Sequence, residues 1–255
     1  MGSKINRIGE KRINNFGSEM IIVEYRGCMN IDVYFPQYDW TAKNIQYDKF
    51  KNSNIRCPYE RRTCGIGYLG EGKYKVLENG KKTKVYDTWH NMLERCYSEK
   101  YPTYKDCEVC DEWHNFQNLG KWCEENYYEV EGQRMNLDKD ILVKHNKIYS
   151  PETCIFVPQA INLLFVKSDK SRGESVIGTS LYKNGKYQVR CYMINPETGK
   201  SKIKHLGYYD TQEKGFKVYK YYKERNIKEV ADYYKEQIPQ ILYNALYNYE
   251  VEIYD

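Results

Sequence analysis

Apolar and polar residues alternate in two regions of the chain, and the first lies near the N-terminus. Residues 20–25 and 31–35 are short runs rich in β-branched and aromatic side chains, which is typical of strands. Residues 26–30 between them fit a hairpin connection, and residues 45–50 fit a third strand or a short helix. The pattern therefore predicts a small β module over residues 1–66.

The second alternating region begins at residue 175. Strands are predicted over residues 175–182, 186–194 and 200–206, with the hairpin signal Asn184-Gly185 after the first and a turn at 195–199 after the second. In the middle strand, one face carries Tyr187, Val189, Cys191 and Met193, and the other carries Gln188, Arg190 and Tyr192.

A helix should follow this sheet, capped by Asp210 with Glu213 completing a reciprocal capping box. Residues 226–255 either extend that helix or add another. Their apolar positions fit packing against the domain and self-association equally well.

Helical spacing dominates the middle of the chain. Residues 84–97 place Val85, Trp89, Met92 and Cys96 on one stripe, with Asp87 or Thr88 as the predicted N-cap. Residues 112–126 predict a second helix with a face formed by Trp113, Phe116, Leu119, Gly120 and Cys123.

Loops and linkers separate these elements. Residues 136–154 are predicted to be a polar loop that ends in a helical turn at Ser150-Pro151-Glu152. The glycine-rich residues 65–72 and the polar residues 167–174 are interpreted as linkers. The prediction is an α+β, multi-domain protein: a small β module (1–66), a central α/β domain (67–166), and a three-stranded antiparallel sheet plus helix with a helical extension (175–255).

Charge is distributed unevenly over these modules. Residues 167–229 carry 15 basic and seven acidic side chains, a net charge of +8, and residues 1–105 carry +7, whereas residues 106–166 carry −6. Basic surfaces attract polyanions such as DNA. No run of 18 apolar residues and no apolar signal core occurs, so we expect a cytoplasmic protein without a membrane span. In that compartment the nine cysteines are expected to be reduced.

The C-terminal region resembles the AP2-like DNA-binding domain of phage and mobile-element endonucleases. The resemblance covers roughly residues 175–225 and is most specific at Gly185-Lys186-Tyr187 and at residues 205–211, HLGYYDT. It implies double-stranded DNA as the partner, with the sheet in the major groove and the helix behind it. The positions that match the groove-facing residues of the family are Ser180, Gln188, Arg190, Tyr192 and His205. Arginine and glutamine suit guanine and adenine edges, and Lys183, Lys186, Lys202 and Lys204 are candidates for phosphate contacts.

The central region resembles the central domain of phage proteins of the HNH endonuclease type, and its bacterial host cytoplasm would be the working compartment. The shared pieces over residues 84–165 include Arg95-Cys96, the segment VCDEW at 109–113, Leu137-Asp138 and YSPE at 149–152. Such a site uses a histidine base and a divalent metal such as Mg²⁺. The usual histidine position is Lys139 here, and a protonated lysine cannot take up a proton. The candidate catalytic residues in its place are Asp138, Asp140, His145 and Asn146.

Four cysteines form a candidate Zn²⁺ site: Cys96, Cys107, Cys110 and Cys154. Cys107 and Cys110 have the spacing of a zinc knuckle, and buried packing thiols are the alternative. Three functions remain open: a site-specific HNH-like endonuclease, a catalytically silent DNA-binding regulator, and a protein-interaction module.

Overall fold

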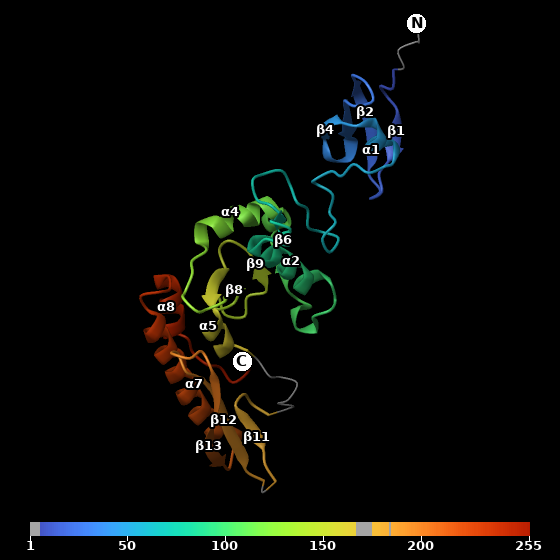
Figure 1. The fold of residues 1–255 in the computed structure, drawn as a ribbon. Helices are drawn as coiled ribbons and strands as arrows, with labels where there is room; N and C mark the ends of the chain where they lie inside the picture. The colour runs from blue at the N-terminus through green and yellow to red at the C-terminus, as the bar shows by residue number, and fades with distance from the viewer. Residues whose placement is uncertain (1–5, 167–174, 184) are drawn as a thin grey trace. The chain divides into compact units, whose positions relative to one another are not determined.

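The computed structural model describes residues 6–166, 175–183 and 185–255, and its helices and strands are drawn in Figure 1. Helices and several antiparallel sheets occur together, which confirms the mixed α+β class. The chain divides into two compact units, Met1–Cys123 and Glu124–Asp255. The division into three modules that the sequence predicts stays a prediction. The linker predicted at 167–174 lies outside the described residues, as does Asn184 of the predicted hairpin turn.

The first unit begins with a four-stranded antiparallel sheet followed by a short helix. Its elements are β1 (Lys11–Ile13), β2 (Glu19–Tyr25), β3 (Ile31–Phe35), η1 (Pro36–Tyr38), β4 (Trp40–Ile45) and α1 (Tyr47–Lys51). The two predicted strands and their hairpin are confirmed, since the Arg26 N–H donates to the Asn30 carbonyl over 3.0 Å. Met20, Ile22, Val33 and Phe50 are fully buried and form the core of this sheet.

The remainder of the first unit is mainly helical. Its elements are β5 (Leu77–Glu78), β6 (Lys81–Lys82), α2 (Lys84–Tyr97), η2 (Pro102–Tyr104), β7 (Glu108–Val109), α3 (Asp111–His114) and α4 (Phe116–Asn126). Helix α2 has the predicted bounds, but its N-cap is Thr83, whose Oγ1 accepts the Tyr86 N–H over 3.2 Å. The single helix predicted at 112–126 is two helices, because Asn115 adopts an extended conformation with ψ 118°.

The glycine-rich segment at 65–72 is a packed segment rather than the predicted linker. A Cβ atom on Gly67 would lie 2.4 Å from Cδ1 of Leu93 and 2.8 Å from Cζ2 of Trp89. Only glycine allows the backbone to approach α2 so closely. The buried side of α3 and α4, which includes Trp113, Phe116 and Leu119, agrees with the predicted face.

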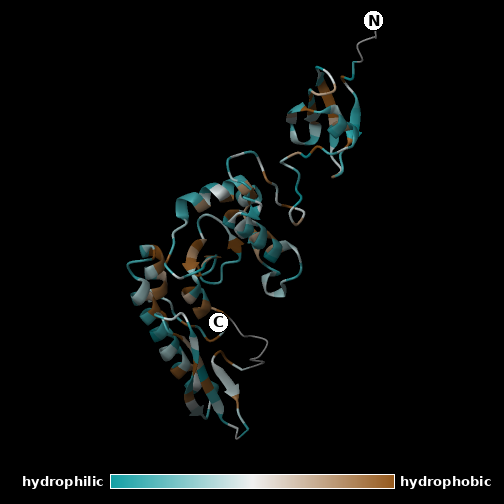
Figure 2. Cartoon of the chain, in the orientation of Figure 1, coloured by the Kyte–Doolittle hydropathy of each residue, from teal (hydrophilic) through white to brown (hydrophobic). Residues whose placement is uncertain are grey.

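The second unit has one core. Its elements are β8 (Met135–Asp138), β9 (Ile148–Tyr149), β10 (Ile155–Pro158), α5 (Gln159–Leu164), β11 (Thr179–Leu181), β12 (Tyr187–Ile194), β13 (Ser201–Tyr209), α7 (Gln212–Tyr234) and α8 (Gln240–Tyr247). Helix α5 is mainly apolar, with Ala160, Ile161 and Leu164 buried, and Figure 2 shows its hydrophobic colouring. Val157 and Ile161 share the core with Val189, Ile227 and Leu246, and all five are fully buried.

The prediction of a polar loop over 136–154 was wrong in part. Strands β8 and β10 pair antiparallel, with Asp138 opposite Ile155. The predicted helical turn is a hydrogen-bonded turn in which the Cys154 N–H donates to the Ser150 carbonyl over 3.0 Å, and the helix begins only at Gln159. The two strands were missed because each has only four residues, which is too short to show a clear alternation.

Strand β12 is the central strand of the C-terminal sheet, with β11 and β13 on either side and α7 across one face. The N-cap of α7 is Thr211 rather than the predicted Asp210, since Thr211 Oγ1 accepts the Lys214 N–H over 3.3 Å. Helix α8 packs back on α7 through Leu242 and Leu246, so the extension adds to the core of this unit.

Two features fix α7 against the sheet. The Asn226 amide accepts from the Ile194 N–H over 2.7 Å and donates to the Ile194 carbonyl over 2.9 Å, so it continues the ladder at the strand end. A Cβ atom on Gly215 would lie 2.9 Å from Cγ2 of Val189, and one on Gly178 would lie 2.1 Å from Cδ2 of Tyr219. These glycines let the helix lie close to the strands.

Candidate nucleic-acid interface

The three-stranded sheet β11–β13 has one side that α7 covers and one side that is largely exposed among the residues that the structure describes. Val189 and Cys191 of β12 are fully buried beneath α7, while Arg190 is exposed and Tyr192 is 54% exposed. Successive residues of a strand point to opposite faces. The alternation of buried and exposed side chains along β12 therefore agrees with the one predicted from the sequence.

The strand register brings the predicted base-reading residues together. Ser180 lies opposite Gln188, Arg190 lies opposite His205, and side chains of opposite residues in an antiparallel pair share a face. The open face is defined here as the side of β11–β13 away from α7. It carries Ser180, Gln188, Arg190, Tyr192 and His205.

A bulge in β13 sets which of its residues reach the open face. Val189 is opposite Gly207 and Arg190 is opposite His205, so Leu206 is the extra residue. Leu206 packs against the core, and His205 is exposed. His205 and Tyr208 are three positions apart, so in a regular strand they would lie on different faces, and the bulge brings them to the same one.

The open face also carries apolar and aromatic residues that the sequence analysis missed. Ile203 is 46% exposed opposite Tyr192, and Tyr208 is 42% exposed opposite Gln188. The Gln188 Nε2 donates to the Tyr208 hydroxyl over 3.2 Å, and the His205 and Tyr208 ring centroids are 4.9 Å apart. The alternation along β13 could have predicted from the sequence that Ile203 lies on the open face. The same prediction for Tyr208 requires knowledge of the bulge.

The four predicted phosphate-contacting lysines lie away from this face. Lys202 and Lys204 are opposite Met193 and Cys191, so they share the side that α7 covers, and Lys204 Nζ lies 4.4 Å from the Tyr222 ring centroid. Lys183 is exposed in the connection between β11 and β12, and Lys186 forms an ion pair with Asp210 at 3.3 Å. The register therefore does not bring these four lysines onto the open face, and their contact with phosphates stays a prediction.

The central loop after β8 is built around Asp138. Its Oδ1 accepts the N–H groups of Asp140 over 2.9 Å and Ile141 over 2.8 Å. Burial, with a smaller effect of the Asp140 charge, raises the pKa of Asp138 to about 6. The carboxylate thus shapes the backbone turn that follows the strand.

Lys139 is buried in the same loop, with 7% of its surface exposed. Its ammonium donates to Asp140 Oδ2 over 3.0 Å and to the Asn146 carbonyl over 3.1 Å. The Asn146 amide donates to the carbonyls of Lys139 and Ile148, each over 2.7 Å. At the position where the HNH resemblance expects a base, this lysine is a hydrogen-bond donor that closes the loop.

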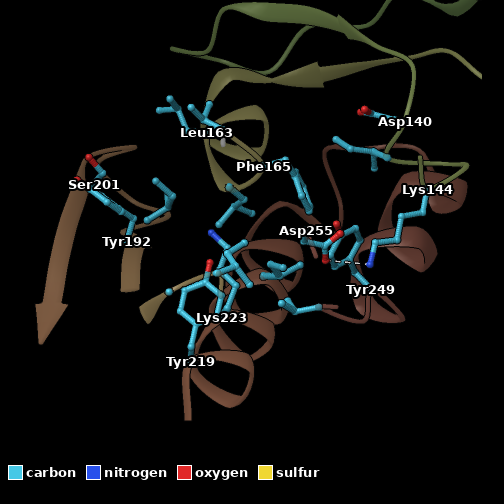
Figure 3. Close-up of a pocket in the computed structure, with 18 of the residues that line it drawn as sticks. Asp140, Lys144, Leu163, Phe165, Tyr192, Ser201, Tyr219, Lys223, Tyr249 and Asp255 are labelled. Carbon is cyan, nitrogen blue, oxygen red and sulfur yellow. Dashed lines mark ion pairs between the residues drawn. The ribbon is translucent and has the colours of Figure 1, made fainter. Parts of the chain in front are cut away.

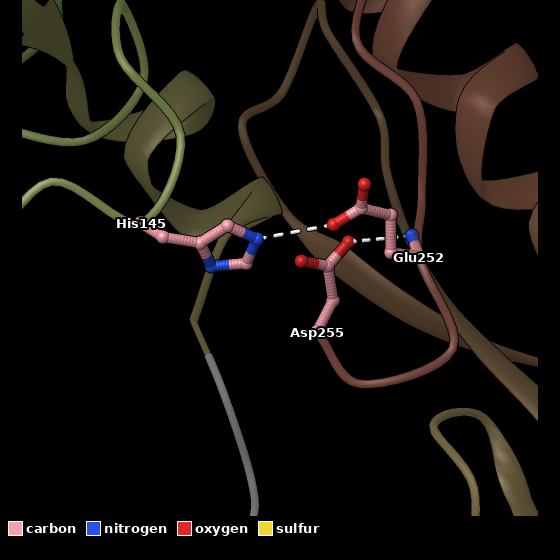
Figure 4. A group of neighbouring side chains, drawn as sticks. All are labelled: His145, Glu252 and Asp255. Carbon is pink, nitrogen blue, oxygen red and sulfur yellow. Dashed lines mark hydrogen bonds and ion pairs between the residues drawn. The ribbon is translucent and has the colours of Figure 1, made fainter.

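His145 lies in the same loop with a left-handed φ of 63°. Its Nε2 is 3.0 Å from Glu252 Oε2, and this contact is the main reason that the pKa of Glu252 is lowered (Figure 4). Among the residues that the structure describes, His145, Glu252 and Asp255 form the one group of histidine, cysteine and acidic residues with ligand atoms within 4.8 Å of one another.

A lysine already neutralises these two carboxylates. Lys144 Nζ lies 3.0 Å from Glu252 Oε2 and 2.9 Å from Asp255 Oδ2. An ammonium group between carboxylates stands where a cation would bind, so the group fits an ion-pair network better than a metal site. The predicted set Asp138, Asp140, His145 and Asn146 shares a loop, but its polar atoms bind backbone groups, Lys139 and Glu252 instead of converging on one point.

The candidate zinc ligands belong to different units. Cys96 ends the buried side of α2, and Cys107 and Cys110 flank β7 in the same unit. Cys154 precedes β10 in the second unit. Cys107 and Cys154 are buried and the other two are half-buried, so Zn²⁺ binding stays a prediction.

Comparisons with known protein families, with curated proteins and with solved structures find no match to this chain. Among the described residues, no helix combines the length and apolar character that spanning a membrane requires.

Proposed function

We propose that the second unit binds double-stranded DNA in a sequence-specific way, with the open face of β11–β13 in the major groove. The observation that carries this proposal is the cluster of Gln188, Arg190 and His205 on one uncovered face. Guanidinium and amide groups form paired hydrogen bonds with the edges of guanine and adenine. A flat sheet backed by a single helix supplies the rigid support that such contacts need.

The distribution of charge supports a DNA partner over a protein partner. Residues 167–229 have a net charge of +8. Tyr192 and Ile203 add apolar surface that suits thymine methyl groups and sugar edges. An ordinary protein-interaction face would not need this excess of cations.

The test begins with selection of a preferred site from random duplexes, followed by fluorescence anisotropy with that site and a scrambled duplex. We expect Arg190→Ala to weaken binding to the selected site by about 1–3 kcal/mol and to reduce the preference over the scrambled duplex. The matched control is Lys217→Ala, which removes the same charge from an exposed position on α7. Equal losses for the two variants, or no loss for Arg190→Ala, would show that the open face does not contact bases.

We further propose that the protein binds DNA without cutting it at the central loop, as a regulator would. The support is Lys139, whose buried ammonium donates to Asp140 and to the loop backbone where a general base is expected. A group that is already protonated and donating cannot accept a proton from water.

Nicking of supercoiled plasmid in Mg²⁺ or Mn²⁺ tests this second point. The variants are His145→Ala and Asp138→Asn, and the latter keeps the Oδ1 acceptor that the Asp140 and Ile141 amides use. We expect no nicking by the wild-type protein. Wild-type nicking that either variant abolishes would assign catalysis to the loop and leave the DNA-binding proposal intact.

A further inference from the structure

A cavity of about 740 Å³ lies within the second unit. Its walls come from the end of α5, the middle of α7, the end of β12, the central loop and the C-terminal segment. The close-up in Figure 3 shows side chains that line the cavity. Cavities of this size are typical of sites for small organic ligands.

Of the 25 described residues that line the cavity, 13 are apolar or aromatic. These residues are Ile141, Leu163, Leu164, Phe165, Val166, Ile177, Tyr192, Ile194, Ile203, Tyr219, Ile227, Tyr249 and Val251. A ligand with an apolar body would therefore be favoured. The lining also contains one charged side chain that is buried, which an apolar ligand alone would not require.

That group is the ammonium of Lys223. Lys223 lies on the inner side of α7, one turn from Tyr219 and one turn from Ile227, and only 9% of its surface is exposed. Its side chain extends from α7 among the residues that line the cavity (Figure 3). Burial lowers its pKa, the neighbouring Cys191 thiol has a smaller opposite effect, and among the described residues no carboxylate forms an ion pair with it.

The acidic residues of the lining have other partners. Asp140 Oδ2 is 3.0 Å from Lys139, and Asp255 Oδ2 is 2.9 Å from Lys144. Neither is available to balance Lys223. A buried cation without a partner is costly, and a bound anion would remove that cost.

We propose that this cavity binds a small organic carboxylate with an apolar body, whose carboxylate pairs with Lys223. Lys223 is the one buried cation among the described residues of the lining, and a single buried positive charge favours a monoanion over a polyphosphate. The apolar walls accommodate an aromatic or aliphatic body, and the exposed Arg190 also belongs to the lining. This proposal does not depend on DNA binding.

The probes are two matched pairs, 4-phenylbutyrate with 4-phenylbutyramide and 2-naphthylacetate with 2-naphthylacetamide, measured by isothermal titration calorimetry on the full chain. We expect at least one carboxylate to bind the wild-type protein about tenfold or more tightly than its amide. Lys223→Met keeps the apolar stem and should lose this preference. Lys217→Met, on the exposed side of the same helix, should keep it.

A second measurement does not depend on a variant. Competitive acetylation of the wild-type protein, read by mass spectrometry, should show that a bound carboxylate protects Lys223 and leaves Lys217 unchanged. The proposal fails if neither carboxylate binds better than its amide, or if Lys223→Met keeps the preference. It also fails if the protein prefers the carboxylate over the amide only after both Asp169→Asn and Glu174→Gln. One of these acidic side chains would then be the counter-ion of Lys223.

The lining of the cavity includes Ser180, Arg190 and Tyr192, which also belong to the open face. A carboxylate in the cavity should therefore weaken DNA binding by the wild-type protein and not by Lys223→Met. This consequence rests on the proposed function. Calorimetry without DNA tests the ligand site alone. A negative calorimetry result would therefore reject the carboxylate site without rejecting DNA binding, and a failure to bind DNA would not reject the carboxylate site.

Discussion

Asp138→Asn should stabilise the second unit at neutral pH. The Asp138 carboxyl has its pKa raised from 3.8 to about 6, chiefly by burial. Its ionised form is therefore less favourable in the folded protein than in the unfolded chain. Asparagine keeps the oxygen that accepts the Asp140 and Ile141 amides and removes the charge.

The magnitude follows from the pKa. A rise from 3.8 to about 6 corresponds to about 3 kcal/mol of lost stability when the group is ionised in both states. Asp138 is only partly buried, and water contact screens its charge, so we expect about 2 kcal/mol. Because the folded pKa is the higher one, this loss is absent below pH 3.8, grows as the pH rises, and is complete above about pH 6.

The assay is urea unfolding at pH 4 and pH 7.5, followed by far-UV circular dichroism and by tryptophan fluorescence. All four tryptophans, at positions 40, 89, 113 and 122, lie in the first unit, so their emission reports that unit alone. We expect the variant to shift the circular dichroism transition upward at pH 7.5, to leave it nearly unchanged at pH 4, and to leave the tryptophan transition in place at both.

The matched control is Glu236→Gln, which removes a charge from an exposed position in the same unit and should change stability by less than about 0.5 kcal/mol at either pH. A variant less stable than wild type at pH 7.5 would refute the reasoning. So would a gain of equal size at both pH values, because the effect would then not come from the charge of Asp138.

Three further substitutions test the packing of the C-terminal sheet against α7, each by urea unfolding followed by circular dichroism. Gly178→Ala should destabilise by about 2 kcal/mol or more, because φ is +76° and the new methyl would lie 2.1 Å from the Tyr219 ring; no loss would mean that the ring moves freely. Asn226→Leu should cost about 3 kcal/mol by leaving the Ile194 N–H and carbonyl unpaired, and a loss below about 1 kcal/mol would contradict this. Thr211→Ala should cost about 1 kcal/mol as a lost N-cap, whereas Asp210→Ala should cost less; the reverse order would restore Asp210 as the cap.

The sequence by itself determined the local elements with strong periodicity. The alternation along residues 187–194 placed Val189 and Cys191 inside and Arg190 and Tyr192 outside, because a strand places successive side chains on opposite faces whatever it packs against. The apolar stripe of residues 84–97 predicted the bounds of α2 correctly, because helical spacing is also a local property of the chain. Weakly patterned segments were not predicted correctly, since β8 and β10 are too short to show a period. The N-caps are Thr83 and Thr211, whereas Asp87 or Thr88 and Asp210 were predicted.

Only the tertiary structure decided what the polar residues do. The bulge at Leu206 determines that His205 and Tyr208 share a face, and it depends on pairing with a strand distant in sequence. Lys139 became a loop-closing donor because Asp140 and Asn146 fold back on it, and Lys223 became a buried cation because α5 and the C-terminal segment close over α7. Periodicity specifies which side of an element is apolar, but the partners of a charged group come from segments whose approach no local pattern records.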